Sequence, residues 1–279
     1  MKQVSSRACR AILSSSVDAP HIGKVSIIEL NNPKTRNAIS WEMLNELDRE
    51  LDRVYAMASR SEVRAVVIAS THDKVFCAGA DLKERQNMTH DEAQQFLTEL
   101  RRVFSKLEGL PVPSIACVSG LALGGGLELA LCCHLRVFSG NAVVGLPETR
   151  LAIIPGAGGT YRLPRVVGPS HALDMILTGR RVSAVEAARM GLCNRLVFSG
   201  ESDCADLDVV RKLTLATALS LARDISAGGP IAIRAALTAL AVPHEEAEND
   251  AYATVLGTCD RLAALHAFQT KGSPQYLGV

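Results

Sequence analysis

Hydrophobic and polar positions follow two different rhythms along the first half of the chain. Short continuous apolar runs, which are typical of buried strands, occur at residues 25–30, 65–69 and 114–118. Longer stretches at residues 40–57 and 90–107 place apolar residues at helical spacing, and Ser40 is a suitable N-cap for the first of them. Strands that alternate with helices predict an α/β fold with a mostly parallel sheet.

The pattern becomes mainly helical after Pro155. Helices are predicted at residues 169–178, 183–190, 206–226, 230–241 and 244–269. No internal repeat or low-complexity linker separates this part from the rest of the chain. We therefore expect a core domain over residues 21–200 and a helical C-terminal region over residues 201–279, which extends the core and is not an independent domain.

Residues 1–20 are interpreted as an N-terminal extension. They carry Lys2, Arg7 and Arg10, five serines and no acidic residue before Asp18. A basic, Ser-rich and acid-poor start resembles part of a mitochondrial presequence, which predicts a location in the mitochondrial matrix. The alternative is a frayed N-terminus of no consequence, for which a cytoplasmic location is expected.

Composition limits the classes of function. The chain has 279 residues, of which 48% are hydrophobic and 21% charged, and its formal net charge is +1. A globular protein is expected, and nucleic acid is disfavoured as its main partner because no global positive field attracts a polyanion. The apolar runs are interrupted well before the roughly 20 residues of a membrane-spanning helix, so no membrane segment is predicted. The eight cysteines include no C-x-x-C pair, which predicts buried thiols in a reducing compartment and no metal site.

Three segments concentrate glycine and small residues, which marks tight turns or a close approach to a ligand. They are residues 76–81, 120–128 and 155–160. In the middle segment a strand leads into glycines and then into a helix, and the free N–H groups of such a helix start favour negative charge. The spacings of a dinucleotide loop, a phosphate loop, a nucleophile elbow and a zinc-protease helix do not occur in the sequence. Nucleotide binding and the commonest hydrolase mechanisms are therefore disfavoured.

Two glutamates are candidate acid–base residues. Glu128 lies in an otherwise apolar helix start, where a carboxylate needs a hydrogen bond, an ion pair or a function, and a helix-dipole role is the alternative. Glu148 follows Pro147 in a loop, and an ion pair with Arg150 is its alternative. Since twenty positions separate the two acids, only the tertiary fold would bring them together.

The chain resembles the crotonase, or enoyl-CoA hydratase/isomerase, superfamily in three ordered segments. These are FCAGADLKER at residues 76–85, LALGGGLELAL at residues 121–131 and GLPETRLAIIPGAGGTYRLPR at residues 145–165. The likeness spans about residues 22–279, and its wording is most similar to the methylglutaconyl-CoA hydratase branch, also called AU-binding hydratases. It implies a crotonase fold with a core of repeated ββα units, and a C-terminal helical region that assembles a homotrimer or a hexamer.

The resemblance also implies a site for an acyl-CoA thioester, with coenzyme A as part of the substrate and no separate cofactor. The backbone N–H groups of Ala80 and Gly125 match the family's oxyanion hole, and Glu128 and Glu148 match its two catalytic carboxylates. Syn addition of water across the 2,3 double bond builds negative charge on the thioester oxygen, which two fixed donors stabilise. We expect Glu148 to donate the proton at the α-carbon and Glu128 to activate the water.

Further contacts with coenzyme A are implied at two places in the chain. Ala80, Asp81, Leu82 and Lys83 are expected to line its entrance, with Lys83 near the adenosine phosphates or, as the alternative, in solvent. Phe268 and Lys271 match family residues that contact the coenzyme A of a neighbouring subunit, although QTKGSPQ replaces a more basic tail.

Some positions depart from the family pattern. His134 stands where Asp is usual and Tyr161 where Gln is common, and both are interpreted as packing changes near the pocket. Catalysis by His134 is the less favoured alternative. Residues 41–55 form a lysine-rich helix in RNA-binding relatives but are acidic here, so RNA binding is disfavoured.

The two carboxylates favour a hydratase that acts on 3-methylglutaconyl-CoA or on a short-chain 2-enoyl-CoA. Two alternatives stay open from the sequence. A Δ3,Δ2-enoyl-CoA isomerase would need one carboxylate to move a proton, and a non-catalytic RNA-binding or interaction protein would use the same scaffold without turnover.

Overall fold

Two β-sheets form the frame of the computed structural model, which describes residues 10–198 and 206–279. The larger sheet has the order β1 (Ile12–Asp18), β2 (Lys24–Leu30), β3 (Val63–Ser70), β5 (Ser114–Val118), β7 (Leu135–Ser139) and β10 (Arg195–Val197). The smaller sheet has the order β4 (Val75–Cys77), β6 (Leu121–Leu123), β8 (Val143–Gly145) and β9 (Arg181–Ser183). Neighbouring strands are parallel except at the pairs β1–β2 and β8–β9.

The chain passes back and forth between the two sheets. β3, β5 and β7 lie in the larger sheet, and each is followed by a strand of the smaller one, namely β4, β6 and β8. This alternation confirms the repeated ββα units that the resemblance implies. The strands of the smaller sheet have three residues each, which is too short for a hydrophobic period to show. The apolar pattern alone therefore predicted one sheet where there are two.

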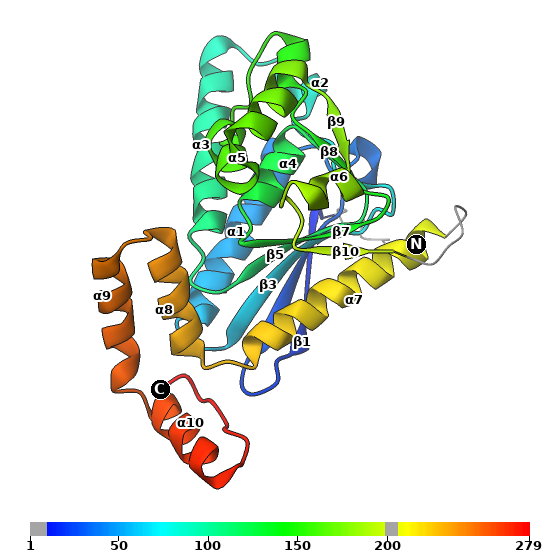
Figure 1. Cartoon of the computed structure of the whole chain (residues 1–279). Coiled ribbons are helices and arrows are strands. Elements are labelled where there is room, and N and C mark those ends of the chain that lie inside the picture. The colour runs from blue at the N-terminus through cyan, green and yellow to red at the C-terminus, as the bar shows by residue number, and fades with distance from the viewer. Residues whose placement is uncertain (1–9, 199–205) are drawn as a thin grey trace, which may run out of the picture.

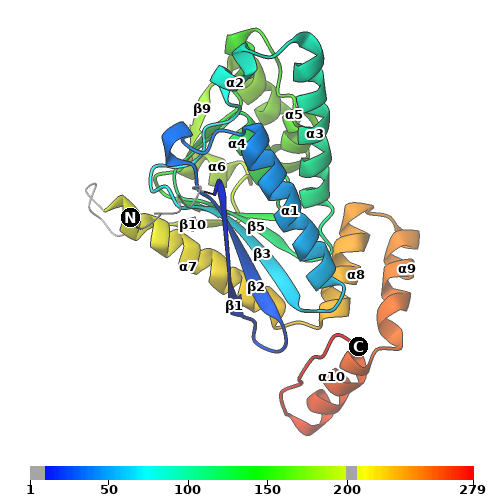
Figure 2. The same cartoon turned by 180° about the vertical axis from the view of Figure 1, so that it is seen from behind.

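The larger sheet is buried on both faces. Along β3, Val66 and Ile68 face the core shared with α1 (Trp41–Ala58) and α3 (His90–Glu108), whereas Ala65 and Val67 face the opposite way. α7 (Leu207–Ser226) covers this second face through residues that include Ala218 and Ala222. Figures 1 and 2 show α7 and α1 on opposite sides of the sheet. The continuous apolar run of β3 is thus explained by two cores.

The main predicted elements of the first half are confirmed. β2, β3, β5, α1 and α3 lie where the apolar runs and the helical spacing place them. Ser40 is the N-cap of α1, because its side chain accepts a hydrogen bond from the Met43 N–H. The other helical elements of this half are η1 (Pro33–Thr35), α2 (Leu82–Gln86), α4 (Gly125–Leu131) and η2 (Glu148–Leu151).

The N-terminal extension contains a strand that the pattern did not predict. β1 pairs antiparallel with β2 from Ile12 opposite Leu30 to Asp18 opposite Lys24, at the edge of the larger sheet. Three of its residues are serines and most of its side chains are exposed, so it shows no apolar rhythm. The presequence-like residues 1–9 lie outside the described part of the chain.

The helices after Pro155 differ from the predicted set at two points. α5 (Gly159–Thr178) begins ten residues before the predicted helix and is kinked at Gly168, which precedes Pro169. The single helix predicted at residues 244–269 is in fact two, α9 (Glu245–Leu256) and α10 (Cys259–Thr270), which separate at Gly257. α6 (Ala184–Arg189), α7 and α8 (Pro230–Ala241) lie where expected.

The C-terminal region divides into a packed part and a projecting part. α7 belongs to the core, whereas α8, α9 and α10 extend away from the sheets (Figure 1). This projecting arm exposes large apolar side chains, among them Leu240, Tyr252, Leu262 and Phe268. None of the helices in the described ranges has the length and apolarity that crossing a bilayer requires.

Candidate active site

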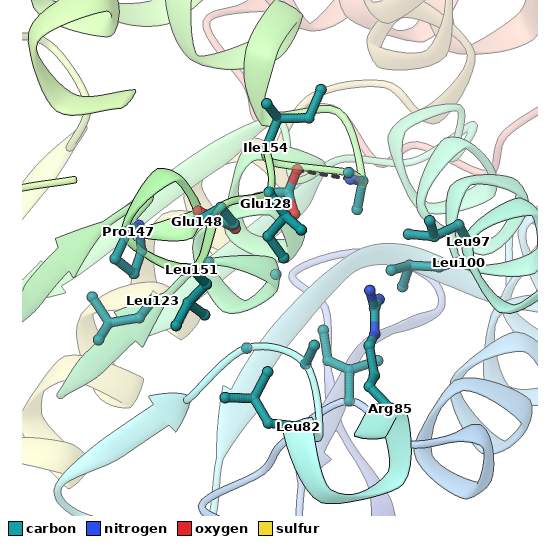
Figure 3. A pocket seen from close by; sticks show the side chains of 18 of the residues that line it. Leu82, Arg85, Leu97, Leu100, Leu123, Glu128, Pro147, Glu148, Leu151 and Ile154 are labelled. Atoms are coloured by element: carbon teal, nitrogen blue, oxygen red, sulfur yellow. Dashed lines mark hydrogen bonds between the residues drawn. The ribbon is translucent and has the colours of Figure 1, made fainter. Parts of the chain in front are cut away.

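The smaller sheet brings the three conspicuous segments of the sequence to one edge. β4, β6 and β8 are parallel neighbours, so their carboxyl ends lie side by side. Ala80 follows β4, Gly125 follows β6 and Glu148 follows β8. These ends open into a cavity of about 570 Å³, which Figure 3 shows from close by. The carboxyl edge of parallel strands is the usual place for a ligand in α/β proteins.

Two backbone amides at this edge are unused. Neither the Ala80 N–H nor the Gly125 N–H donates a hydrogen bond to another described residue. The two amides are close neighbours, since a methyl group built on Gly125 would lie 3.7 Å from the Ala80 nitrogen. Gly126 lets the helix start approach β4, because a Cβ there would lie 2.2 Å from the Cys77 oxygen. Two free N–H donors side by side can stabilise negative charge on an oxygen that approaches both of them.

Glu128 is held rigidly on the first turns of α4. Glu128 is 2% exposed, and its Oε1 accepts hydrogen bonds from the Ala157 and Gly159 N–H groups, both at 2.8 Å. The glycine-rich segment 155–160 is therefore the anchor of this carboxylate. Burial raises the pKa of Glu128, while the two N–H groups and the charges of Arg162 and Arg85 oppose that rise.

Glu148 is held more loosely in η2. It is 9% exposed, and its buried Oε2 has no hydrogen-bond partner in the described part of the chain. Burial raises its pKa to about 7, and the charge of Glu128 adds to the rise. The alternative of an ion pair with Arg150 is wrong, because the Arg150 Nε donates to the Thr178 carbonyl instead, at 2.8 Å.

Gly124 sets how closely Glu148 approaches the helix start. A Cβ at Gly124 would lie 2.9 Å from the Glu148 Oε1, so the carboxylate rests against bare backbone. Gly124 has φ 53° and ψ −126°, a conformation that side chains strongly disfavour. The glycine cluster thus serves both the free amides and the position of the second acid.

Aliphatic side chains and two arginines, Arg85 and Arg101, also line the pocket. The aliphatic lining residues include Leu82, Leu97, Leu100 and Ile154. Arg85 projects from α2 between Leu82 and Leu97 (Figure 3). Burial lowers the pKa of Arg85, and the charges of Glu128 and Glu84 oppose that shift. Arg85 does not stand out in the sequence. Its only signal was that it shares with Leu82 the short helix after Ala80.

The structure does not bring every predicted contact to the pocket. Leu82 lines the pocket, Lys83 is exposed on α2, and Asp81 caps that helix by accepting from the Lys83 and Glu84 N–H groups. Phe268, which is 84% exposed, and Lys271 lie on or just after α10, in the projecting arm and away from this pocket.

The two departures from the family pattern also lie outside the pocket lining. The His134 Nδ1 accepts from the Ser114 backbone N–H at 3.0 Å, at the start of β5. Tyr161 is exposed on α5, where the guanidinium of Arg162 stacks on its ring at 4.8 Å. Neither side chain lines the pocket, which fits the predicted packing roles. In the described ranges, no cluster of His, Cys, Asp and Glu has the arrangement of a metal site.

Two free amides beside one anchored and one unanchored carboxylate form the arrangement expected of an acid–base enzyme that stabilises negative charge on a substrate oxygen. The particular family follows from comparison with known proteins. The chain belongs to the enoyl-CoA hydratase/isomerase family, whose model matches residues 22–277. This membership confirms the predicted resemblance and the crotonase fold, and it places the chain among enzymes.

Individual relatives agree with this assignment. An enoyl-CoA isomerase/hydratase of Penicillium crustosum is 58% identical over 267 residues, which cover 96% of this chain but 30% of that longer relative. A mitochondrial methylglutaconyl-CoA hydratase 1 of Pyricularia oryzae is 45% identical, over 95% of this chain and 86% of its own length. The crystal structure of an enoyl-CoA hydratase from Bacillus anthracis has a TM-score of 0.86 and 38% identity, over 96% of this chain and 100% of that one.

Proposed function

We propose that this chain is an enoyl-CoA hydratase, which adds water syn across the 2,3 double bond of an enoyl-CoA thioester. The observation that carries the proposal is the pair Glu128 and Glu148, two buried carboxylates on one pocket beside two unused backbone donors. Hydration needs one group to activate water and one to supply a proton, and two acids with different surroundings can divide this work.

The Ala80 and Gly125 N–H groups form the oxyanion hole in this proposal. As water attacks the β-carbon, negative charge moves onto the thioester oxygen, and fixed amides stabilise it without having to reorganise. The start of α4 adds the positive end of its peptide dipoles. Losing one such donor typically costs roughly 3 to 4 kcal/mol of transition-state stabilisation.

The surroundings of the two acids support separate roles. Glu148 has a pKa of about 7, so at neutral pH a large fraction is protonated and able to give a proton to the α-carbon. Glu128 accepts two N–H hydrogen bonds on Oε1, which leaves its other oxygen to orient and activate the water. Because the two groups face one pocket, their titrations are coupled.

The names of the relatives support a particular acyl-CoA substrate and a cellular location. Methylglutaconyl-CoA hydratases among them support 3-methylglutaconyl-CoA, with a short-chain 2-enoyl-CoA as the alternative, and the mitochondrial ones support the mitochondrial matrix. Coenzyme A enters as part of the substrate, so no separate cofactor is needed. The apolar surface of the arm α8–α10 fits assembly into a homotrimer or a hexamer, in which Phe268 and Lys271 would approach a neighbouring subunit's coenzyme A, and Lys83 would lie near the adenosine phosphates.

The test is to follow loss of the conjugated enoyl-thioester absorbance together with formation of the hydroxyacyl product. The proposal expects both, with the product formed by syn addition. Double-bond migration without hydroxyacyl product would instead identify an isomerase. This alternative stays open because two fungal relatives are named enoyl-CoA isomerase/hydratase. RNA binding is disfavoured because Asp48 and Asp52 of α1 hold Lys106 of α3 in ion pairs, at 2.7 and 2.6 Å.

A further inference from the structure

Arg85 places a guanidinium in the pocket without a hydrogen-bond or ion-pair partner among the described residues. Its Nε is buried, and within the described ranges none of its nitrogens forms a hydrogen bond or an ion pair. The guanidinium stacks over the ring of Phe96, whose centroid lies 4.9 Å from the guanidinium carbon. Figure 3 shows the side chain pointing from α2 into the cavity.

Three fully buried arginines show how unusual this is. Arg64, Arg136 and Arg162 are each at most 5% exposed, and each donates several hydrogen bonds. Arg162 also pairs with Glu108 at 2.6 Å. Arg85 is half-buried, but its buried Nε lacks such a partner, and an unpaired buried polar group costs free energy. Arg85 therefore has the character of a binding group and not of a structural one.

The acids near Arg85 are already engaged. A Glu84 oxygen accepts from the Trp41 N–H at 3.2 Å, and the Glu128 Oε1 accepts from two amides. Arg101, a second cation that lines this pocket, donates through Nε to the Gly156 carbonyl at 2.7 Å. The cavity therefore combines leucine walls with a guanidinium that no described carboxylate pairs with, which suits an apolar chain that ends in an anion.

We infer that Arg85 is a specificity-determining residue that pairs with a carboxylate at the far end of the acyl chain, so that the site prefers enoyl-CoA thioesters of dicarboxylic acids. The inference rests on the proposed function, since the oxyanion hole at Ala80 and Gly125 fixes the thioester end beside the start of α2. It favours 3-methylglutaconyl-CoA over a neutral short-chain thioester. A planar guanidinium is well suited to this task because it binds a carboxylate through two parallel hydrogen bonds.

The experiment compares hydration of glutaconyl-CoA with that of hex-2-enoyl-CoA, which has a similar length and a neutral end. Wild type is expected to prefer glutaconyl-CoA in kcat/KM. Arg85→Met is expected to lower kcat/KM for glutaconyl-CoA by about 100-fold and to change it for hex-2-enoyl-CoA by only a few fold. Arg85→Lys should keep part of the preference, because it keeps the charge and loses the planar fork. Arg102→Met removes a charge from α3 outside the pocket lining and should keep the whole preference.

Binding of saturated thioesters separates this inference from the proposed function. Calorimetry of glutaryl-CoA and hexanoyl-CoA needs no turnover, and wild type should bind glutaryl-CoA more tightly, with the advantage lost in Arg85→Met. If wild type shows that difference but hydrates neither enoyl-CoA, the proposed function fails and the role of Arg85 stands. Equal binding of the two thioesters by wild type, or equal losses on both in Arg85→Met, would overturn the role of Arg85.

Discussion

Glu128 and Glu148 face the same pocket from two segments that treat their carboxylates differently. Glu128 sits in α4, and one of its oxygens accepts two backbone N–H hydrogen bonds from segment 155–160. Glu148 sits in η2, and one of its oxygens is buried without a partner in the described part of the chain. Burial raises the pKa of both, but an opposing set of hydrogen bonds and positive charges acts chiefly on Glu128.

The difference shows how one fold can hold an acid and a base a short distance apart. Anchoring by N–H donors favours the ionised form of Glu128, because an amide hydrogen bond is stronger to a carboxylate than to a neutral acid. Leaving Glu148 unanchored favours its neutral form. Two residues of the same type thereby receive different preferences for the neutral and the ionised form from their surroundings alone.

The largest effect is expected from removing the acid of Glu148. Glu148→Gln keeps the shape of the side chain but gives it no proton to donate to carbon, so kcat for hydration should fall by about 1,000-fold or more. Steady-state hydration of crotonyl-CoA measures the loss. Glu62→Gln, on the exposed rim of the larger sheet, is the matched control and should keep wild-type activity. A Glu148→Gln enzyme within tenfold of wild type would remove Glu148 from the chemistry.

Moving Glu148 without changing it should have the next largest effect. In Gly124→Ala, the new methyl group would lie 2.9 Å from the Glu148 Oε1 and displace the carboxylate. A displacement of about 1 Å can cost about 100-fold in rate, and the backbone strain costs on the order of 1 to 3 kcal/mol of stability. Gly257→Ala is the control, since a Cβ there meets no atom within 4 Å. Normal kcat in Gly124→Ala would show that the position of Glu148 does not matter.

The raised pKa of Glu148 predicts a gain of stability on its removal. The neutral form is favoured in the fold, so ionisation penalises folding as the pH rises from the ordinary pKa of 4.5 to about 7. Glu148→Gln should therefore match wild type near about pH 4 and exceed it by up to roughly 3 kcal/mol above about pH 8. Urea unfolding at both pH values measures the difference. A constant difference at the two pH values would contradict the raised pKa.

The smallest effect on activity is expected at His134, which lies outside the lining of the pocket that the two acids share. The half-buried ring accepts from the Ser114 N–H, and burial lowers its pKa. His134→Phe leaves that donor unpaired and should lower the free energy of unfolding by about 1 to 3 kcal/mol, with kcat within twofold of wild type. A large loss of kcat in a folded variant would instead support the catalytic alternative.

The sequence predicted the parts of the fold that carry a long rhythm. α1, α3, β2, β3 and β5 were visible because each buries a stripe or a full run of apolar residues. The three-residue strands of the smaller sheet and the serine-rich β1 show no such periodicity. Pairing with neighbouring strands holds them in place. The break between α9 and α10 at Gly257 interrupts a helical pattern that otherwise continues.

The candidate site was predictable in its residues but not in its electrostatics. The glycine clusters and the two glutamates stand out in the sequence, and the fold brings them to one edge of the smaller sheet. Which oxygen is anchored and which is left unpaired depends on segment 155–160 folding back onto α4. The sequence does not reveal Arg85 for the same reason. Whether its guanidinium has a hydrogen-bond or ion-pair partner depends on the tertiary fold.

The division of labour between the two acids is tested most directly by hydrogen exchange at the α-carbon of butyryl-CoA in D₂O. This reaction uses the oxyanion hole and the α-carbon base but needs no water attack, so it isolates one role. Wild type and Glu128→Gln are expected to exchange the α-hydrogen, whereas Glu148→Gln is not. Exchange that survives in Glu148→Gln and disappears in Glu128→Gln would show that the two roles are reversed.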